Sequence, residues 1–172
     1  MTILRAFKEH REWITGGSHL ALLVPVVMQS SGPIVELGCG LWSTPVLHWA
    51  CYQRKRPLHT YENNERFNDF VNLFRSDYHQ VSIVPDYTSI VFPDPCGVAF
   101  VDQVPEYSRK DTIRMLTHAE YVVIHDTNPG QRRSKQYSFE QIWDLFNYRF
   151  DLGPSPGTTV VSNVHDVEKA FS

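Results

Sequence analysis

The chain of 172 residues has few cysteines, no long apolar run and little net charge, and each shortage excludes a class of protein. Its longest apolar stretch, residues 20–28, is too short to cross a bilayer and contains Pro25, so we expect no membrane association. The three cysteines lack the spacing of a metal or redox site, which suits reduced thiols in a cytoplasmic protein. A net charge of -3 gives no general attraction to nucleic acid.

Internal repeats, low-complexity tracts and composition shifts are also absent, so nothing in the sequence marks a domain boundary. The length fits one domain with a single substantial core and leaves no room for a second catalytic domain. We therefore expect residues 1–172 to form one domain. Within it, residues 1–30 are expected to form two N-terminal helices, at 3–15 and 18–30, that could act as a lid.

Helices and strands alternate through the rest of the sequence. Strands are expected at residues 33–38, 57–62, 79–84, 98–101, 121–125, 147–152 and 157–163. Helices are expected at 43–53, 64–76, 107–118 and near 139–146. The last two strands are joined by a short turn-rich link, Gly-Pro-Ser-Pro-Gly, which favours a hairpin over a parallel crossover. The pattern predicts an α/β protein with a mostly parallel sheet that ends in an antiparallel hairpin.

The most informative stretch joins a buried strand to a helix through two glycines. Glu36 lies two positions before Gly38, and Gly38 and Gly40 allow positive φ and close approach of a ligand to the backbone. Ser43 or Thr44 can cap the next helix, whose N-terminal amides favour a negatively charged ligand group. Because Ser43 stands where a dinucleotide fingerprint has its third glycine, NAD is disfavoured. The stretch indicates a nucleoside-bearing ligand, although a turn without any ligand shares the pattern.

Residues 36–40, Glu-Leu-Gly-Cys-Gly, resemble motif I of the class I S-adenosylmethionine (SAM)-dependent methyltransferases. In that family the glycine turn lies under the methionine and ribose part of SAM, so the resemblance implies SAM as the cofactor. It covers residues 30–165 and implies a Rossmann-like, doubly wound sheet of seven strands in the order 3-2-1-4-5-7-6. Trp42 departs from the family, in which many members have a glycine at that place.

Acidic residues follow nearly every expected parallel strand, at the edge where open α/β sheets bind ligands. Glu62 lies 22 residues after Gly40, close to the offset at which an acid binds ribose hydroxyls. The resemblance gives Glu62 that role towards SAM and places Asp86 at the adenine amino group, with Tyr87 as a stacking neighbour. Asp102, at the end of the fourth strand, joins the same cofactor-binding set. Each acid could instead be solvated or could cap the next helix.

Asp102, His125 and Asp126 are the candidate catalytic residues, because methyl transfer to oxygen needs an aligned acceptor that loses a proton. The ends of the fourth and fifth strands resemble those of metal-dependent small-molecule O-methyltransferases, in which carboxylates bind Mg²⁺ and the ion lowers the pKa of the acceptor hydroxyl. Two mechanisms therefore stay open. Either Asp102 and Asp126, with Asn128, hold a divalent cation, or His125 acts as general base with Asp102 or Asp126 orienting its ring.

The sequence thus predicts a SAM-dependent methyltransferase that acts on a hydroxyl of a small molecule. The chain lacks the Asn/Asp-Pro-Pro-aromatic motif of amino-methylating DNA enzymes, which argues against a nucleic-acid substrate. Two alternatives remain, a non-catalytic SAM- or nucleotide-binding module or partner subunit, and another SAM- or nucleoside-using enzyme on the same scaffold. A homo-oligomer is a further expectation, because so small a domain could borrow a cover for its site from a second subunit.

Overall fold

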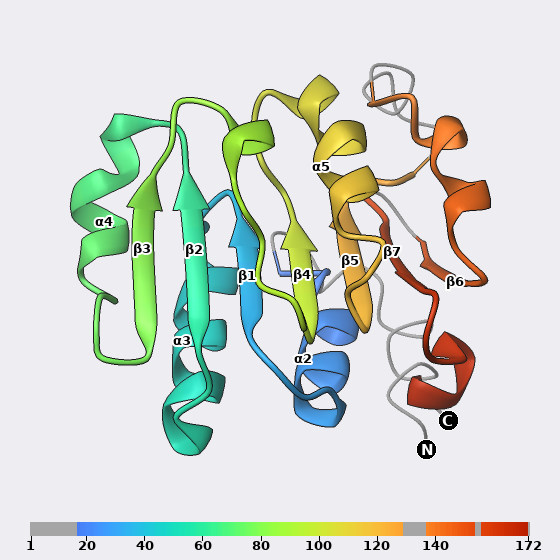
Figure 1. The fold of residues 1–172 in the computed structure, drawn as a ribbon, viewed down its shortest axis with the longest axis horizontal. Coiled ribbons are helices and arrows are strands. Elements are labelled where there is room, and N and C mark those ends of the chain that lie inside the picture. The colour runs from blue at the N-terminus through green and yellow to red at the C-terminus, as the bar shows by residue number, and fades with distance from the viewer. Residues whose placement is uncertain (1–16, 129–136, 154–155, 172) are drawn as a thin grey trace.

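The computed structural model describes residues 17–128, 137–153 and 156–171. These residues form a sheet of seven strands in the order β3-β2-β1-β4-β5-β7-β6 (Figure 1). The strands are β1 (Ile34–Leu37), β2 (Leu58–Glu62), β3 (His79–Ile83), β4 (Val98–Val101), β5 (Tyr121–His125), β6 (Tyr148–Leu152) and β7 (Thr158–Ser162). The first five are parallel, whereas β7 runs antiparallel to both β5 and β6. The predicted sheet order and the predicted antiparallel end are confirmed.

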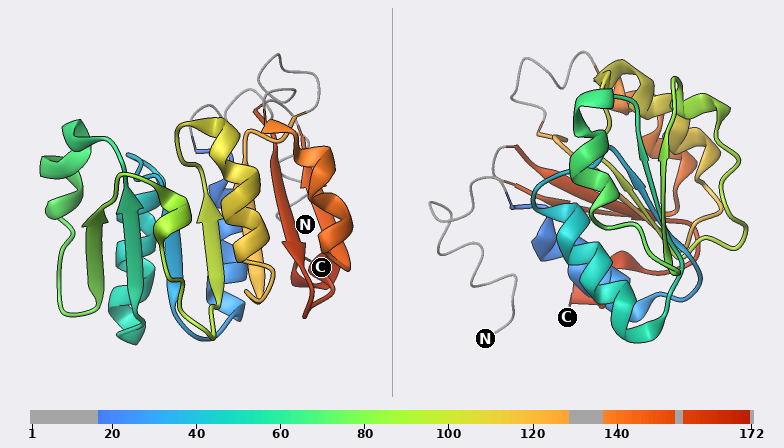
Figure 2. Two further views of the ribbon diagram at one scale, coloured as in Figure 1. Left: turned by 45° about the horizontal axis from the view of Figure 1, so that its top comes forward. Right: turned by 90° about the vertical axis from the view of Figure 1, so that its left-hand side faces the viewer.

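Two apolar cores lie on the opposite faces of this sheet, because neighbouring residues of a strand point to opposite sides. Ile34 of β1 packs in the core beneath α2 (Leu20–Gln29) and α3 (Ser43–Arg54), whereas Val35 packs in the core beneath α5 (Arg109–Met115). Figure 2 shows α2 and α3 on one face and α5 on the other. Strands β4 and β5 are covered on both faces, which explains their almost entirely apolar sequence.

The second expected N-terminal helix forms as α2, and its Leu22, Leu23 and Val26 are fully buried against the sheet. The first expected helix, at residues 3–15, lies outside the described residues, and the lid role stays a prediction. Among the described helices, none is long and apolar enough to cross a membrane.

Three of the expected helices were predicted too long. The segment 64–76 forms a 3-10 turn, η2 (Glu65–Phe67), and a short helix, α4 (Asn68–Asn72), and the segment 107–118 forms η4 (Glu106–Ser108) followed by α5. The segment near 139–146 forms only two 3-10 turns, η5 (Phe139–Gln141) and η6 (Trp143–Leu145). Further 3-10 turns are η3 (Tyr87–Ser89) and η7 (Val167–Phe171). Phe139 and Ile142 of the last segment are nevertheless buried in the core, and Trp143 and Phe146 pack against it.

Candidate active site

The carboxyl ends of the parallel strands meet at one edge of the sheet, the upper edge in Figure 1. The register places Glu36 of β1 beside Thr60 of β2 and Phe100 of β4, so these three side chains share the face covered by α2 and α3. Asp102, two residues after Phe100, continues on this face. The sheet therefore gathers most of the predicted site residues at this edge.

The turn after β1 requires a glycine at position 38. Gly38 has a φ of 85°, and a Cβ there would lie 2.8 Å from both the carbonyl oxygen of Asp102 and Cα of Gln103. Gly40 differs from the prediction, because its φ is not positive. A Cβ at Gly40 would meet only Oγ of Ser43, at 3.2 Å, so this position leaves room for a ligand to approach.

Glu36 lies fully buried beneath this turn. Its carboxylate accepts hydrogen bonds from Oγ1 of Thr44 at 3.0 Å and from Oγ1 of Thr60 at 2.7 Å. Burial raises the pKa of Glu36 to about 7. The expected helix caps are wrong, since α3 has Trp42 at its N-cap and no side chain caps it. Thr44 instead accepts the amide of Gly40 at 3.0 Å, so it ties the turn to Glu36.

Glu62 fastens the glycine turn to the end of β2. Its Oε2 accepts the amide of Cys39 at 2.9 Å, and its Oε1 accepts the amides of Asn63 at 3.0 Å and Asn64 at 2.8 Å. A carboxylate offers about four lone-pair sites, so one remains for a ligand hydroxyl. The predicted ribose role of Glu62 is compatible with these contacts and stays a prediction.

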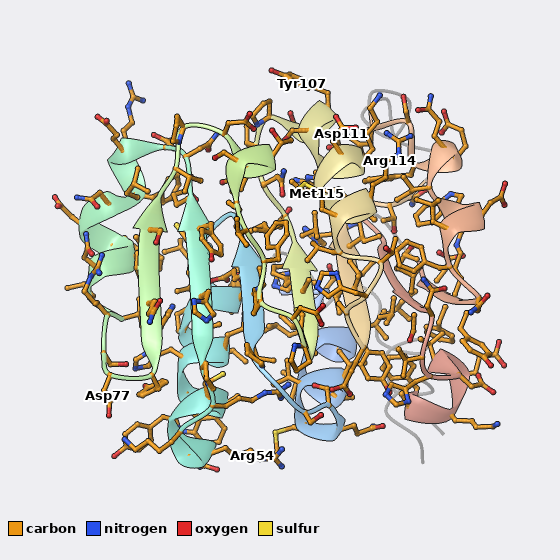
Figure 3. The ribbon with its side chains drawn as sticks, viewed as in Figure 1. Arg54, Asp77, Tyr107, Asp111, Arg114 and Met115 are labelled. Carbon is orange, nitrogen blue, oxygen red and sulfur yellow. The ribbon has the colours of Figure 1, made fainter. Side chains whose placement is uncertain are left out.

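Asp86 and Tyr87 have local partners of their own. Asp86 accepts from the amide of Thr88 at 2.9 Å and from its hydroxyl at 2.6 Å, and these bonds lower the pKa of Asp86. The ring of Tyr87 is buried in the core, its hydroxyl donates to Asn63 at 3.4 Å, and burial raises its pKa. Both residues line a cavity of about 320 Å³ together with Tyr107, which Figure 3 shows at the upper edge. Their adenine-binding roles stay predictions.

The three predicted catalytic residues come together at the ends of β4 and β5. Nδ1 of His125 lies 3.3 Å from Oδ2 of Asp102 and 3.7 Å from Oδ1 of Asp126. Asp126 has a φ of 60°, a strained backbone conformation of the kind found at functional sites. Both ring nitrogens of His125 are buried, and neither makes a hydrogen bond within the described part of the chain. Nδ1 nevertheless faces the two carboxylates, whereas Nε2 points away from them.

Arg109, at the start of α5, was missed by the sequence reasoning. Its guanidinium is 2% exposed, and Nη2 donates to Oδ1 of Asp102 at 2.9 Å. Nη1 donates to the carbonyl oxygen of His125 at 3.0 Å and reaches Oδ2 of Asp126 at 3.4 Å. Burial by itself raises the pKa of Asp102, but the neighbouring His125 and Arg109 outweigh it and lower the pKa. One available signal was a cation in the first turn of a helix, where the helix dipole disfavours it.

A second histidine was missed as well. His19 is buried before α2, with its ring centroid 4.9 Å from that of Phe100 and 4.8 Å from that of His125. Burial, aided by the neighbouring His125, lowers the pKa of His19 to about 4, so the ring is neutral. Within the described residues, neither ring nitrogen of His19 nor the hydroxyl of Thr158, which pairs with His125 in the sheet, has a hydrogen-bond partner. Nothing in the sequence distinguished His19 from an ordinary residue of an apolar helix.

Mg²⁺ does not fit these residues. One atom each from Asp102, His125 and Asp126 lies within 4.8 Å of the others, as in many metal sites. However, the guanidinium of Arg109 contacts both carboxylates, and its charge opposes a second cation. Magnesium also prefers oxygen to the nitrogen of His125. The proposed metal ligand Asn128 lines a different cavity of about 250 Å³. Its backbone N–H donates to the carbonyl oxygen of Pro156 at 3.1 Å.

No protein-family model matches the chain, and no curated protein matches it by sequence. Solved structures do match its fold. A candidate O-methyltransferase from Klebsiella pneumoniae is 16% identical with a TM-score of 0.60, and the match covers 93% of this chain and 89% of that one. The SAH-bound methyltransferase PaMTH1 from Podospora anserina is 10% identical with a TM-score of 0.61, and the match covers 93% and 85%.

The N-methyltransferase NodS from Bradyrhizobium japonicum also matches, at 12% identity and a TM-score of 0.58, over 84% of this chain and 92% of that one. These similarities, with the sheet order, show that the chain has the fold of the class I SAM-dependent methyltransferases. Because these proteins include both O- and N-methyltransferases, the fold does not identify the acceptor.

Proposed function

We propose that the protein transfers the methyl group of SAM to a hydroxyl of a small molecule. The observation that carries this proposal is the position of the Asp102–His125 pair, next to the glycine turn on the ligand-binding edge of a methyltransferase-type sheet. SAM would lie over Gly38 and Gly40, with its ribose at Glu62. The SAH-bound neighbour supports this choice of cofactor.

In the proposed step, the acceptor oxygen forms a bond to the methyl carbon while the carbon–sulfur bond breaks, which leaves S-adenosylhomocysteine. The acceptor proton passes to Nε2 of His125. Asp102 faces Nδ1 at 3.3 Å, so it favours the tautomer that carries a proton on Nδ1 and leaves Nε2 as the base. The same carboxylate stabilises the imidazolium once His125 has gained the proton.

The acceptor we infer is small and polar. Buried polar atoms are normally hydrogen-bonded, yet His19, His125 and Thr158 all carry nitrogen or oxygen atoms without partners in the described structure. A hydroxylated acceptor that displaced the side chains covering these atoms would supply those partners. An apolar acceptor would leave them unsatisfied, at a cost of about 1–3 kcal/mol for each group.

Replacement of the base tests the function directly. With a panel of catechols, sugars and amines as acceptors, the wild type should form S-adenosylhomocysteine with a hydroxylated acceptor. His125→Gln should lose about a hundredfold or more in turnover, because the proton then has no acceptor, while SAM affinity stays within about twofold. The matched control is His118→Gln, since His118 is exposed and contacts only the carbonyl oxygen of Pro93 among the described groups. Full turnover in His125→Gln, or transfer to amines alone, would refute the assignment.

A further inference from the structure

We propose that Arg109 takes the place of a divalent cation at the ends of β4 and β5, so that methyl transfer at this site needs no metal. The inference builds on the proposed function but makes a claim of its own about cation binding. It starts from a geometric observation. Asp102, Asp126 and His125 lie close enough together to hold a metal ion, and the positive charge that contacts both carboxylates is a side chain of the same protein.

Arg109 links the residues of this cluster by hydrogen bonds to the ends of both strands. Its Nη2 donates a hydrogen bond to Oδ1 of Asp102 at 2.9 Å. Its Nη1 donates to the carbonyl oxygen of His125 at 3.0 Å and to Oδ2 of Asp126 at 3.4 Å. The third nitrogen, Nε, donates to the carbonyl oxygen of Gln103 at 2.8 Å. One guanidinium therefore contacts the ends of both strands, with the fixed fork geometry that lysine lacks.

The burial of Arg109 makes its role as counter-charge to the two carboxylates specific to this arginine. The side chain is 2% exposed, and its guanidinium lies 5.2 Å from the centroid of the buried Tyr137 ring. Removal of one partner of a buried ion pair leaves an uncompensated charge, so Arg109 and the carboxylates depend on each other. Arg114 in the same helix differs sharply, because its pair with Asp111 is exposed on the outer side of α5 (Figure 3).

The charges also suit a proton-accepting histidine. Two carboxylates and one guanidinium leave a single negative charge, which His125 balances when it accepts a proton. Among the described residues, the titratable side chains that face this unit are His125 from β5, His19 from the start of α2 through the His125 ring, and Tyr137 beside the guanidinium. Arg109 holds Oδ1 of Asp102 and thereby turns Oδ2 towards Nδ1 of His125, so we assign Arg109 as a positioning residue.

The test measures Mn²⁺ binding by electron paramagnetic resonance, without SAM or acceptor. The wild-type protein should bind no Mn²⁺ at Asp102, so Asp102→Asn should leave its Mn²⁺ binding unchanged. Arg109→Met should bind Mn²⁺ at least about tenfold more tightly, because two carboxylates lose their internal counter-charge. The double variant Arg109→Met with Asp102→Asn should lose that gain, and the matched control Arg114→Met should behave as wild type.

Two outcomes would overturn the proposal. One is Mn²⁺ binding in the wild type that Asp102→Asn abolishes, and the other is a folded Arg109→Met protein that binds Mn²⁺ no better than the wild type. Circular dichroism checks folding of each variant. If Arg109→Met does not fold, the comparison of wild type with Asp102→Asn still decides. Since neither arm uses SAM, failure here is distinguishable from failure of the proposed methyl transfer.

Discussion

At the scale of single residues, Glu62 has the clearest structural task. Three backbone amides, from Cys39, Asn63 and Asn64, converge on its carboxylate at 2.8–3.0 Å. These bonds tie the glycine turn to the end of the neighbouring strand. Glu62 therefore shapes the turn at the proposed SAM site, and one lone-pair site of its carboxylate is left for a ligand.

Glu62→Gln should weaken SAM binding by about 1–3 kcal/mol, since an amide nitrogen cannot accept the bonds that one carboxylate oxygen accepts. Isothermal titration calorimetry measures the change. Glu65→Gln is the matched control, because Glu65 is exposed in the adjacent turn η2. An affinity of Glu62→Gln equal to that of the wild type would mean that the ribose lies elsewhere.

Residues of the site differed in how well the sequence revealed them. Asp102 and Asp126 directly follow apolar strands and His125 ends one, so their meeting at one edge was predictable from the alternation of strands and helices. Arg109 and His19 were missed because their roles depend on tertiary packing. Arg109 reaches the site from the opposite face of the sheet, and His19 reaches it from the turn before α2, more than a hundred residues before His125.

At the scale of elements, the turn between β1 and α3 depends on tight packing against the end of β4. Gly38→Ala should lower the free energy of unfolding by about 2 kcal/mol or more, because a Cβ meets backbone atoms at 2.8 Å and the φ of 85° strains any side chain. Urea denaturation measures the loss. Gly153→Ala is the control, since a Cβ there meets nothing within 4 Å. Equal stability of the two variants would contradict the packing described here.

The strands were easier to predict than the helices. Each predicted strand agrees with the structure to within one residue at either end, because buried apolar runs between turn residues leave few alternatives. The predicted helices near 64–76 and 139–146 were too long, since an apolar stripe fixes the buried face and not the hydrogen-bond pattern. Asn64, for example, accepts the amide of Arg66 and begins a 3-10 turn.

At the scale of the whole molecule, a buried chain of hydrogen bonds crosses the sheet from the site towards β3. Thr60 donates to Glu36 at 2.7 Å and contacts Nε2 of His79 at 2.8 Å. His79 in turn meets His48 at 3.0 Å, and the hydroxyl of Tyr78 lies 2.6 Å from His48. Several titratable groups are thus buried together, which links stability to pH.

Stability should fall as the pH drops from about 6.5 towards 4. Burial lowers the pKa of His19 and His79 from 6.5 to about 4, so only the unfolded chain gains these two protons in that range. Glu36 acts in the opposite direction, because its pKa rises from 4.5 to about 7 and the folded chain takes up that proton. Two protons favour unfolding and one favours folding.

Urea denaturation at pH 7 and pH 5 measures this difference. His79→Gln removes one of the two histidine protons, so the loss of stability between these pH values should shrink relative to the wild type. The exposed His118→Gln should change nothing. A pH dependence of His79→Gln identical to that of the wild type would show that His79 is not held neutral by the fold.

We expect the edge built by Gly38, Gly40 and Glu62 to bind SAM. Calorimetric titration of the wild-type protein with SAM, S-adenosylhomocysteine and NAD tests it most directly. Both sulfur nucleosides should bind with micromolar or tighter affinity and one site per chain, whereas NAD should give no heat. If neither SAM nor S-adenosylhomocysteine gives heat at protein concentrations that detect micromolar binding, the account is contradicted.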